Sequence, residues 1–167
     1  MKTLFRTLLL LSLIVWLGAE IFFPVVAQVT FGQLAGNTHA AGQIVGALLR
    51  ILHGIGLVCG VVLLALLALA PAWGVFKART VLASIGLVLV MVVLTAYSQY
   101  GMIPTMEKDR LTAANGAIDS LPADDPARLD FNRLHKRSET VEEAVVLLGL
   151  IVVALIANAE TAAANRA

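Results

Sequence analysis

Four long apolar stretches constrain the fold of this chain more than any other feature. They cover about residues 7–31, 42–69, 80–100 and 141–159. A helix needs about 20 mostly apolar residues to cross the hydrocarbon core of a bilayer, and each stretch comes close to or exceeds this length. The sequence therefore predicts an all-α fold: an integral membrane four-helix bundle that forms a single four-span domain over residues 1–167.

The composition agrees with a membrane environment. Of the 167 residues, 59% are hydrophobic and only 14% are charged, whereas about 25% of the residues of a soluble domain are charged. A small soluble core would not cover so much apolar surface, so the lipid bilayer is the expected partner. The formal net charge of +1 leaves no basic excess for binding nucleic acid. Cys59 is the only cysteine, which excludes a disulfide framework and a CxxC redox motif.

The three connections between the stretches differ in length and charge. The first connection, residues 32–41, is short and polar. The second, residues 70–79, carries Lys77 and Arg79. Residues 103–140 form a long extramembrane loop that holds most of the charge. We expect this loop to be partly helical and to break near Pro122 and Pro126, because proline does not continue a helix.

The basic residues favour one orientation in the membrane. With the N-terminus in the cytoplasm, the cytoplasmic side holds Lys2, Arg6, Lys77, Arg79 and Arg166. The basic residues on the outer side, Lys108, Arg110, Arg128, Arg133, Lys136 and Arg137, all lie in the long loop, and long loops count for less in the positive-inside rule. We therefore expect a multi-pass protein of the bacterial inner (plasma) membrane with a cytoplasmic N-terminus. A cleaved secretory signal is disfavoured, because Glu20 and bulky residues occupy the region where small residues should precede a cleavage site.

Three ionisable residues lie inside the first two spans. Glu20 is in the first span, and Arg50 and His53 are in the second, three residues apart and thus on one helix face. Each costs about 2.5–3.5 kcal/mol to insert into the membrane, so each needs a partner or a function. Counted from the first connection at about 1.5 Å per residue, the three lie at a similar depth of roughly 12–17 Å.

The antiparallel order of the spans brings polar residues of the other two helices to the same end. The third span contributes Tyr97, Gln99 and Tyr100, and the fourth contributes His135, Ser138, Glu142 and Glu143. We predict a polar cavity that binds a cation, a proton or a polar small molecule. The ligand candidates are Glu20, Arg50, His53, Tyr97 and Glu142. The alternative is an ion pair between Glu20 and Arg50 that only holds two helices together.

Glycines recur at four-residue intervals in the second span. Gly42, Gly46 and Gly54 share this spacing with Arg50, and Gly56 and Gly60 lie beside them. Small residues at such spacing let helix backbones approach closely, so we expect a tightly packed seam here.

The sequence contains none of the common catalytic signatures. It has no phosphate loop, no GxSxG elbow and no HExxH helix, so we expect no enzyme activity, no cofactor and no metal. A haem or metal-binding redox protein remains the alternative, with ligands drawn from His39, His53 and His135. Three scattered histidines make a weak ligand set.

Two short motifs carry a resemblance to a known family. The first span contains Trp16-Leu17-Gly18, and an F-x-x-L-H-x-x-S stretch runs from Phe131 through His135 to Ser138. With these motifs the chain resembles the transmembrane protein 205-like family, which in bacteria is an integral membrane domain of unknown function. The resemblance implies a four-helix membrane domain with no established reaction. It also points towards transport, because a eukaryotic relative is associated with drug export.

The second motif also has a purely structural interpretation. Ser138 would lie near the N-cap of the last helix, with Glu142 in its first turn and His135 at the membrane interface. The sequence also departs from the family pattern after Ser138, because Glu142 and Glu143 stand where similar proteins often have an Asn followed by apolar residues.

These observations favour a small non-enzymatic membrane protein that binds or transports a small polar or cationic species through a buried polar cluster. The first alternative is a structural or accessory subunit with an intramembrane ion pair. Four spans are few for a transporter, and the chain shows no internal repeat, so a transporting form would be a homo-oligomer.

Overall fold

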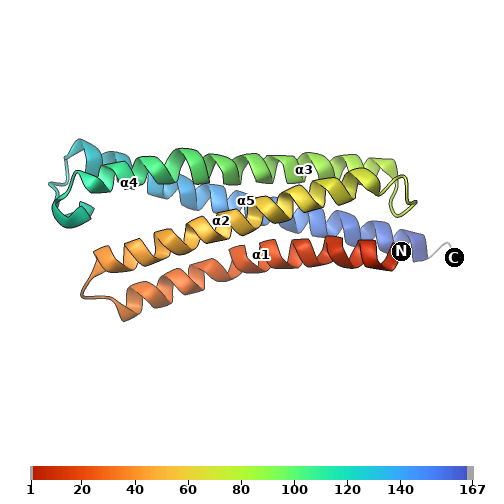
Figure 1. Ribbon diagram of the computed structural model, residues 1–167, viewed down its shortest axis with the longest axis horizontal. Helices are drawn as coiled ribbons and strands as arrows, with labels where there is room; N and C mark the ends of the chain where they lie inside the picture. Colours follow the sequence, from red (N-terminus) through yellow and green to blue (C-terminus); the bar gives the residue numbers. More distant parts are fainter. Residues whose placement is uncertain (1, 165–167) are drawn as a thin grey trace.

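The computed structural model describes residues 2–164, and its regular elements in this range are all helices (Figure 1). Four helical segments are long and apolar enough to span a membrane. They are α1 (Lys2–Gln33), α2 (Thr38–Leu69), a composite third span (Ala78–Leu111) and the greater part of α5 (Pro126–Ala164). The predicted all-α four-helix bundle is confirmed. Arg166, which entered the charge count, lies outside the described residues.

The third span is one continuous rod with an irregular turn. It consists of α3 (Ala78–Tyr97), a π-helical turn η1 (Ser98–Met102) and α4 (Ile103–Leu111). Pro104 is the second residue after this turn. A proline lacks the backbone N–H and its ring clashes with the carbonyl four residues earlier, so the wider turn gives the helix room to continue. Such π turns are frequent at functional sites.

The predicted extramembrane loop is shorter and more helical than expected. Because α4 extends the third span and α5 begins at Pro126, only residues 112–125 lie between long helices. They contain the short turns η2 (Ala114–Gly116) and η3 (Ile118–Ser120). The predicted breaks near Pro122 and at Pro126 are confirmed.

The start of α5 corrects the prediction that Ser138 caps the last helix. The Asp125 carboxylate accepts a hydrogen bond from the backbone N–H of Ala127 at 2.8 Å. Pro126 occupies the first turn, where its missing N–H costs nothing. Ser138 lies well inside α5 and is buried.

The long helices pack in a ring, in which α1 contacts α2 and α5, and α3 contacts α2 and α5. Two apolar clusters fill the bundle. The larger contains Trp16, Leu63, Met91 and Val152, and the smaller contains Met102, Met106 and Leu134. At the end opposite the termini, the connection between α1 and α2 diverges from α4 and the turns that follow it (Figure 1).

The close approach of α1 to α2 occurs at Gly56 and Gly60, which lie beside the row of Gly46 and Gly54 that was expected to form the seam. A Cβ on Gly56 would lie 2.5 Å from Trp16 Nε1, and a Cβ on Gly60 would lie 3.1 Å from the same ring. Gly46 and Gly54 instead face open space, with nothing within 4 Å of an added Cβ. The predicted seam along Gly46 and Gly54 is therefore wrong, because the indole of Trp16 crosses α2 on another face.

Candidate functional site

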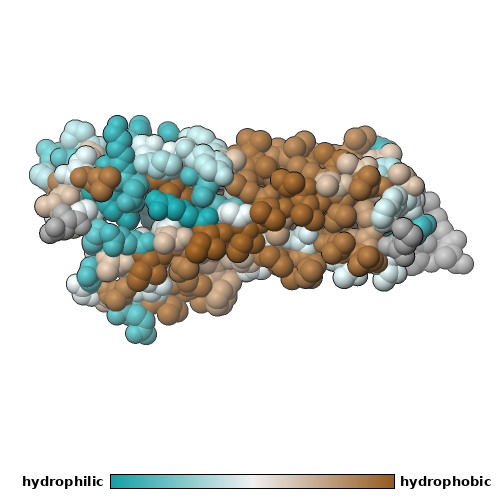
Figure 2. Space-filling view, viewed as in Figure 1, coloured by the Kyte–Doolittle hydropathy of each residue, from teal (hydrophilic) through white to brown (hydrophobic). Residues whose placement is uncertain are grey.

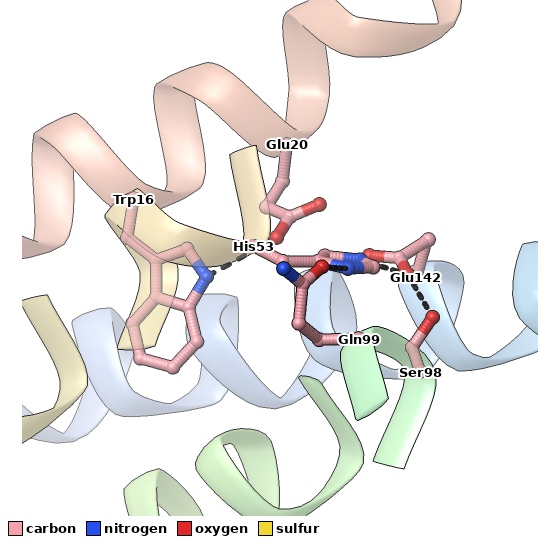
Figure 3. Close-up of polar contacts among 6 residues, drawn as sticks. All are labelled: Trp16, Glu20, His53, Ser98, Gln99 and Glu142. Atoms are coloured by element: carbon pink, nitrogen blue, oxygen red, sulfur yellow. Dashed lines mark hydrogen bonds and ion pairs between the residues drawn. The ribbon is translucent and has the colours of Figure 1, made fainter. Parts of the chain in front are cut away.

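A buried polar cluster lies near the middle of the bundle (Figure 3). Its members come from all four membrane helices: Trp16, Glu20, His53, Ser98, Gln99 and Glu142. His53 is the sixteenth of the 32 residues of α2, about 22 Å from the start of that helix. The cluster is therefore deeper than predicted, because α2 begins four residues earlier than the apolar stretch did.

His53 is the centre of this cluster and is completely buried. Its Nδ1 lies 3.1 Å from Gln99 Oε1, and its Nε2 lies 2.7 Å from Glu142 Oε1. Both partners are oxygens that accept hydrogen bonds. Nδ1 therefore carries a proton, and a second proton lies between Nε2 and Glu142, on one side or the other.

Glu20 is held by a fully buried tryptophan. Trp16 Nε1 donates a hydrogen bond to Glu20 Oε1 at 3.1 Å, and only 3% of Glu20 is exposed. Since the Trp16 ring rests against Gly56 and Gly60, the packing of α1 on α2 fixes the direction of the Glu20 carboxyl. An indole N–H is a donor only, so it favours a carboxyl oxygen at this position.

Glu142 joins the two halves of the cluster. Its Oε1 accepts hydrogen bonds from His53 and from Ser98 Oγ, the latter at 3.3 Å. Its Oε2 is buried and receives no hydrogen bond from an N–H or O–H donor of the described residues. Glu20 is an electrostatic neighbour of Glu142, and both side chains line the same cavity. Two carboxylates that lie close together in a buried site repel each other, and a proton between them removes this repulsion.

A large cavity leads from the hydrophilic end of the bundle to this cluster. Its volume is about 1170 Å³, and it lies between α1 and α2 on one side and α4, α5 and the connecting turns on the other. Figure 2 shows the hydrophilic residues gathered around a hollow in this half of the molecule. Along the antiparallel helices, Glu20 on α1 and Glu142 on α5 belong to the inner end of its lining.

The charged lining of the cavity is mostly acidic. The carboxylates are Glu20, Glu107, Asp119, Glu139, Glu142 and Glu143, and the only arginines in the lining are Arg50 and Arg110. Apolar and aromatic residues complete the wall, among them Phe23, Phe31, Leu49, Met106 and Phe131. The cavity therefore combines negative charge with an apolar surface.

The predicted ion pair between Glu20 and Arg50 is wrong. Arg50 Nη2 lies 3.6 Å from Glu107 Oε2, and the two side chains are 45% and 43% exposed. Glu107 also pairs with Arg110 at 3.8 Å. Glu20 instead contacts Trp16 and Glu142. This exchange of partners was not predicted, because the third span was expected to end before Glu107.

Tyr97 does not belong to the site, contrary to prediction. It is 53% exposed and is absent from the cavity lining. The following π turn instead directs Ser98 and Gln99 into the cluster. Gln99 was expected at this end of the bundle, whereas Ser98 was missed. The polar pair Ser98-Gln99 at the end of an apolar stretch is the signal that would have identified it.

The motif residues that carried the family resemblance have different environments. Trp16 belongs to the cluster, whereas Gly18 is exposed. Phe131 lines the cavity beneath the Arg110 guanidinium, which lies 5.4 Å from the ring centroid. The His135 ring is stacked on Phe131, and its Nε2 lies 3.4 Å from Glu139 Oε1. Ser138 is buried and also lines the cavity.

The histidines do not converge on a common point with other metal-ligating groups. Within residues 2–164, no three His, Cys, Asp or Glu side chains form a group that could hold a metal ion. Both ring nitrogens of His53 are already engaged. His39, expected in a loop, lies in the first turn of α2 and lines the cavity with His135.

Comparison with known proteins places the chain in a family. Residues 11–114 match the family described as "Domain of unknown function (DUF4149)". The chain belongs to this DUF4149 family. The matched segment contains Trp16, Glu20, His53, Ser98 and Gln99. Helix α5, which carries Glu142 of the cluster, lies beyond the matched segment. No curated protein and no solved structure matches the chain.

Proposed function

We propose that this DUF4149 protein binds a small organic cation in its acidic cavity and carries it across the membrane. The observation that supports the proposal is the lining of the cavity, in which six carboxyl groups face two arginines. One arginine, Arg50, is already paired with Glu107, which also contacts Arg110. The carboxyls of Glu20 and Glu142 at the inner end have no arginine beside them in the described contacts, so a ligand would supply the missing positive charge.

The apolar part of the lining narrows the ligand class. Ligand pockets commonly measure about 300–1,000 Å³ and combine apolar walls with a few polar groups. The volume of about 1170 Å³ suits an organic cation with apolar substituents better than a bare metal ion. Aromatic residues such as Phe23, Phe31 and Phe131 in the wall favour a cation further, because aromatic faces attract positive charge.

The membrane location, the orientation and the oligomeric state of the protein belong to the same proposal. We place the protein in the bacterial inner membrane with a cytoplasmic N-terminus, as a binding and transport protein and not an enzyme. A homo-oligomer is the form in which four spans per chain would support transport. The narrower relation to the transmembrane protein 205-like family is also part of the proposal, and the motif residues Phe131, His135 and Ser138 line the proposed binding cavity.

Binding of tetraphenylphosphonium to the purified protein in mild detergent tests this function. This cation has a permanent charge and apolar substituents, and uncharged triphenylphosphine oxide is its control. We expect binding of the cation, weakened about tenfold by Glu142→Gln, which corresponds to roughly 1.4 kcal/mol. Asp124→Asn is the matched variant, because Asp124 is exposed and does not line the cavity. Equal binding of the neutral analogue, or no binding of either compound, would contradict the proposal.

A structural or accessory subunit is the second candidate. It is favoured by one observation: the hydrogen bonds of the polar cluster join α2, the third span and α5, and Glu20 of α1 is an electrostatic neighbour of Glu142. In this case Glu142→Gln would lower the resistance of the protein to unfolding, and the wild-type protein would bind no cation. Measuring both cation binding and resistance to unfolding on the same samples distinguishes the transport protein from the structural subunit.

A further inference from the structure

The polar cluster contains three neighbouring titratable side chains, two of which, His53 and Glu142, are hydrogen-bonded to each other. Glu20 comes from α1, His53 from α2 and Glu142 from α5. The other elements packed around them present neutral groups to the cluster: the Trp16 indole from α1 and the Ser98 hydroxyl and Gln99 amide from η1. The nearby charges on α4, Glu107 and Arg110, also line the cavity, as do Arg50 on α2 and Glu139 and Glu143 on α5.

The hydrogen bonds determine how many protons this cluster holds. His53 needs a proton on Nδ1 to donate to Gln99, and a second proton lies between Nε2 and Glu142. With these two protons alone, an imidazolium and two carboxylates give a net charge of −1. A third proton between the carboxyls of Glu20 and Glu142 brings the net charge to zero. It also offers a donor to the Glu142 side chain, whose buried Oε2 has no hydrogen-bond partner among the described residues.

Neutrality matters because the cluster is buried within apolar helices. Glu20 is 3% exposed and His53 is fully buried, so an uncompensated charge here is costly. Arg50 does not compensate it, because it pairs with Glu107. Either a proton or another monovalent cation next to the carboxyl pair restores neutrality.

We propose that the carboxyl pair of Glu20 and Glu142 is a proton-binding site, and that a cation entering the inner end of the cavity replaces this proton. The O–H bond at the pair breaks and the proton leaves to solvent through the cavity, while the cation takes up the same position. One positive charge is exchanged for another, and nothing is oxidised or reduced. The protein thus exchanges a proton for its ligand, a mechanism that rests on the proposed cation binding.

Two measurements test this exchange. In the first, tetraphenylphosphonium is titrated calorimetrically at one pH in phosphate and in Tris, which differ in ionisation enthalpy. The dependence of the heat on the buffer gives the number of protons released. We expect about one proton per bound cation, and an affinity that falls by up to about tenfold for each unit of decreasing pH while the pair is protonated. Glu20→Gln should abolish the proton release, and Asp124→Asn should retain it.

The second measurement detects the proton without any ligand or variant. Infrared spectroscopy of the wild-type protein should show the C=O stretch of a protonated carboxyl group at a pH where exposed carboxyls are ionised, and the band should shift in D₂O. Absence of this band would overturn the proton site. Cation binding with no proton release would overturn the exchange while leaving the proposed function intact. Failure to bind the cation at any pH would overturn both the proposed function and the exchange. If the infrared band of a protonated carboxyl group were still present, it would support the proton site alone.

Discussion

Replacing Gly56 by alanine tests the contact that positions Glu20. The added Cβ would lie 2.5 Å from Trp16 Nε1 and 3.0 Å from Trp16 Cε2, whereas non-bonded carbon atoms prefer separations of about 3.5–4.0 Å. The indole would therefore have to retreat by about 1 Å. Trp16 is fully buried and also rests on Gly60, so no free space receives it.

The expected loss of stability has two parts. Overpacking of a well-filled core costs about 1–3 kcal/mol. Displacing the indole also breaks its hydrogen bond to Glu20, and a hydrogen bond to a charged group contributes about 1.5–3 kcal/mol. Together we expect Gly56→Ala to lower the free energy of unfolding by roughly 2.5–6 kcal/mol.

The matched control is Gly54→Ala, two residues earlier on the same helix. An added Cβ there has nothing within 4 Å, and alanine is favoured over glycine in a helix by about 1 kcal/mol. Unfolding in mixed micelles of mild detergent and sodium dodecyl sulfate, followed by circular dichroism, compares the two variants. In a Trp73→Phe background, Trp16 is the single tryptophan, and its fluorescence should change only with Gly56→Ala. Equal stability of the two variants would refute the described packing of Trp16 on α2.

Two further substitutions test how the polar residues are paired. Glu20→Gln and Arg50→Gln should have effects on unfolding that add to within about 0.5 kcal/mol, because the two side chains have different partners; rescue of one by the other would restore the ion pair that the sequence favoured. Tyr97→Phe should leave cation binding unchanged, because Tyr97 is 53% exposed and lies outside the cavity lining; a tenfold weaker affinity, measured by the same titration, would contradict its placement.

The number and type of the elements could be read from the sequence because hydropathy is a local property. Each span contains enough consecutive apolar residues to require a helix in lipid, whatever its neighbours are. That Glu20 and His53 lie at a similar depth also follows from counting along the chain, although the earlier start of α2 places His53 deeper than the count predicted. For this reason these two residues, with Glu142 at the start of the fourth apolar stretch, could be proposed together for one site.

The partners of these residues could not be read in the same way. Glu142 lies 89 positions from His53, and their contact depends on the rotation and register of α2 and α5. Arg50 is not the partner of Glu20 because it pairs with Glu107 of α4. The sequence placed α4 in an extramembrane loop, so this competing partner was not expected. A π turn that no hydropathy pattern reveals brings Ser98 and Gln99 inward and leaves Tyr97 exposed.

The sequence by itself thus determined the membrane helices and the buried polar residues they carry, because the bilayer acts on each segment separately. Only the tertiary structure decided that two acidic side chains meet beside His53 at the inner end of a cavity. That decision depends on how side chains such as Trp16 pack against a glycine on a neighbouring helix, and packing of this kind is a property of helix pairs and not of any one segment.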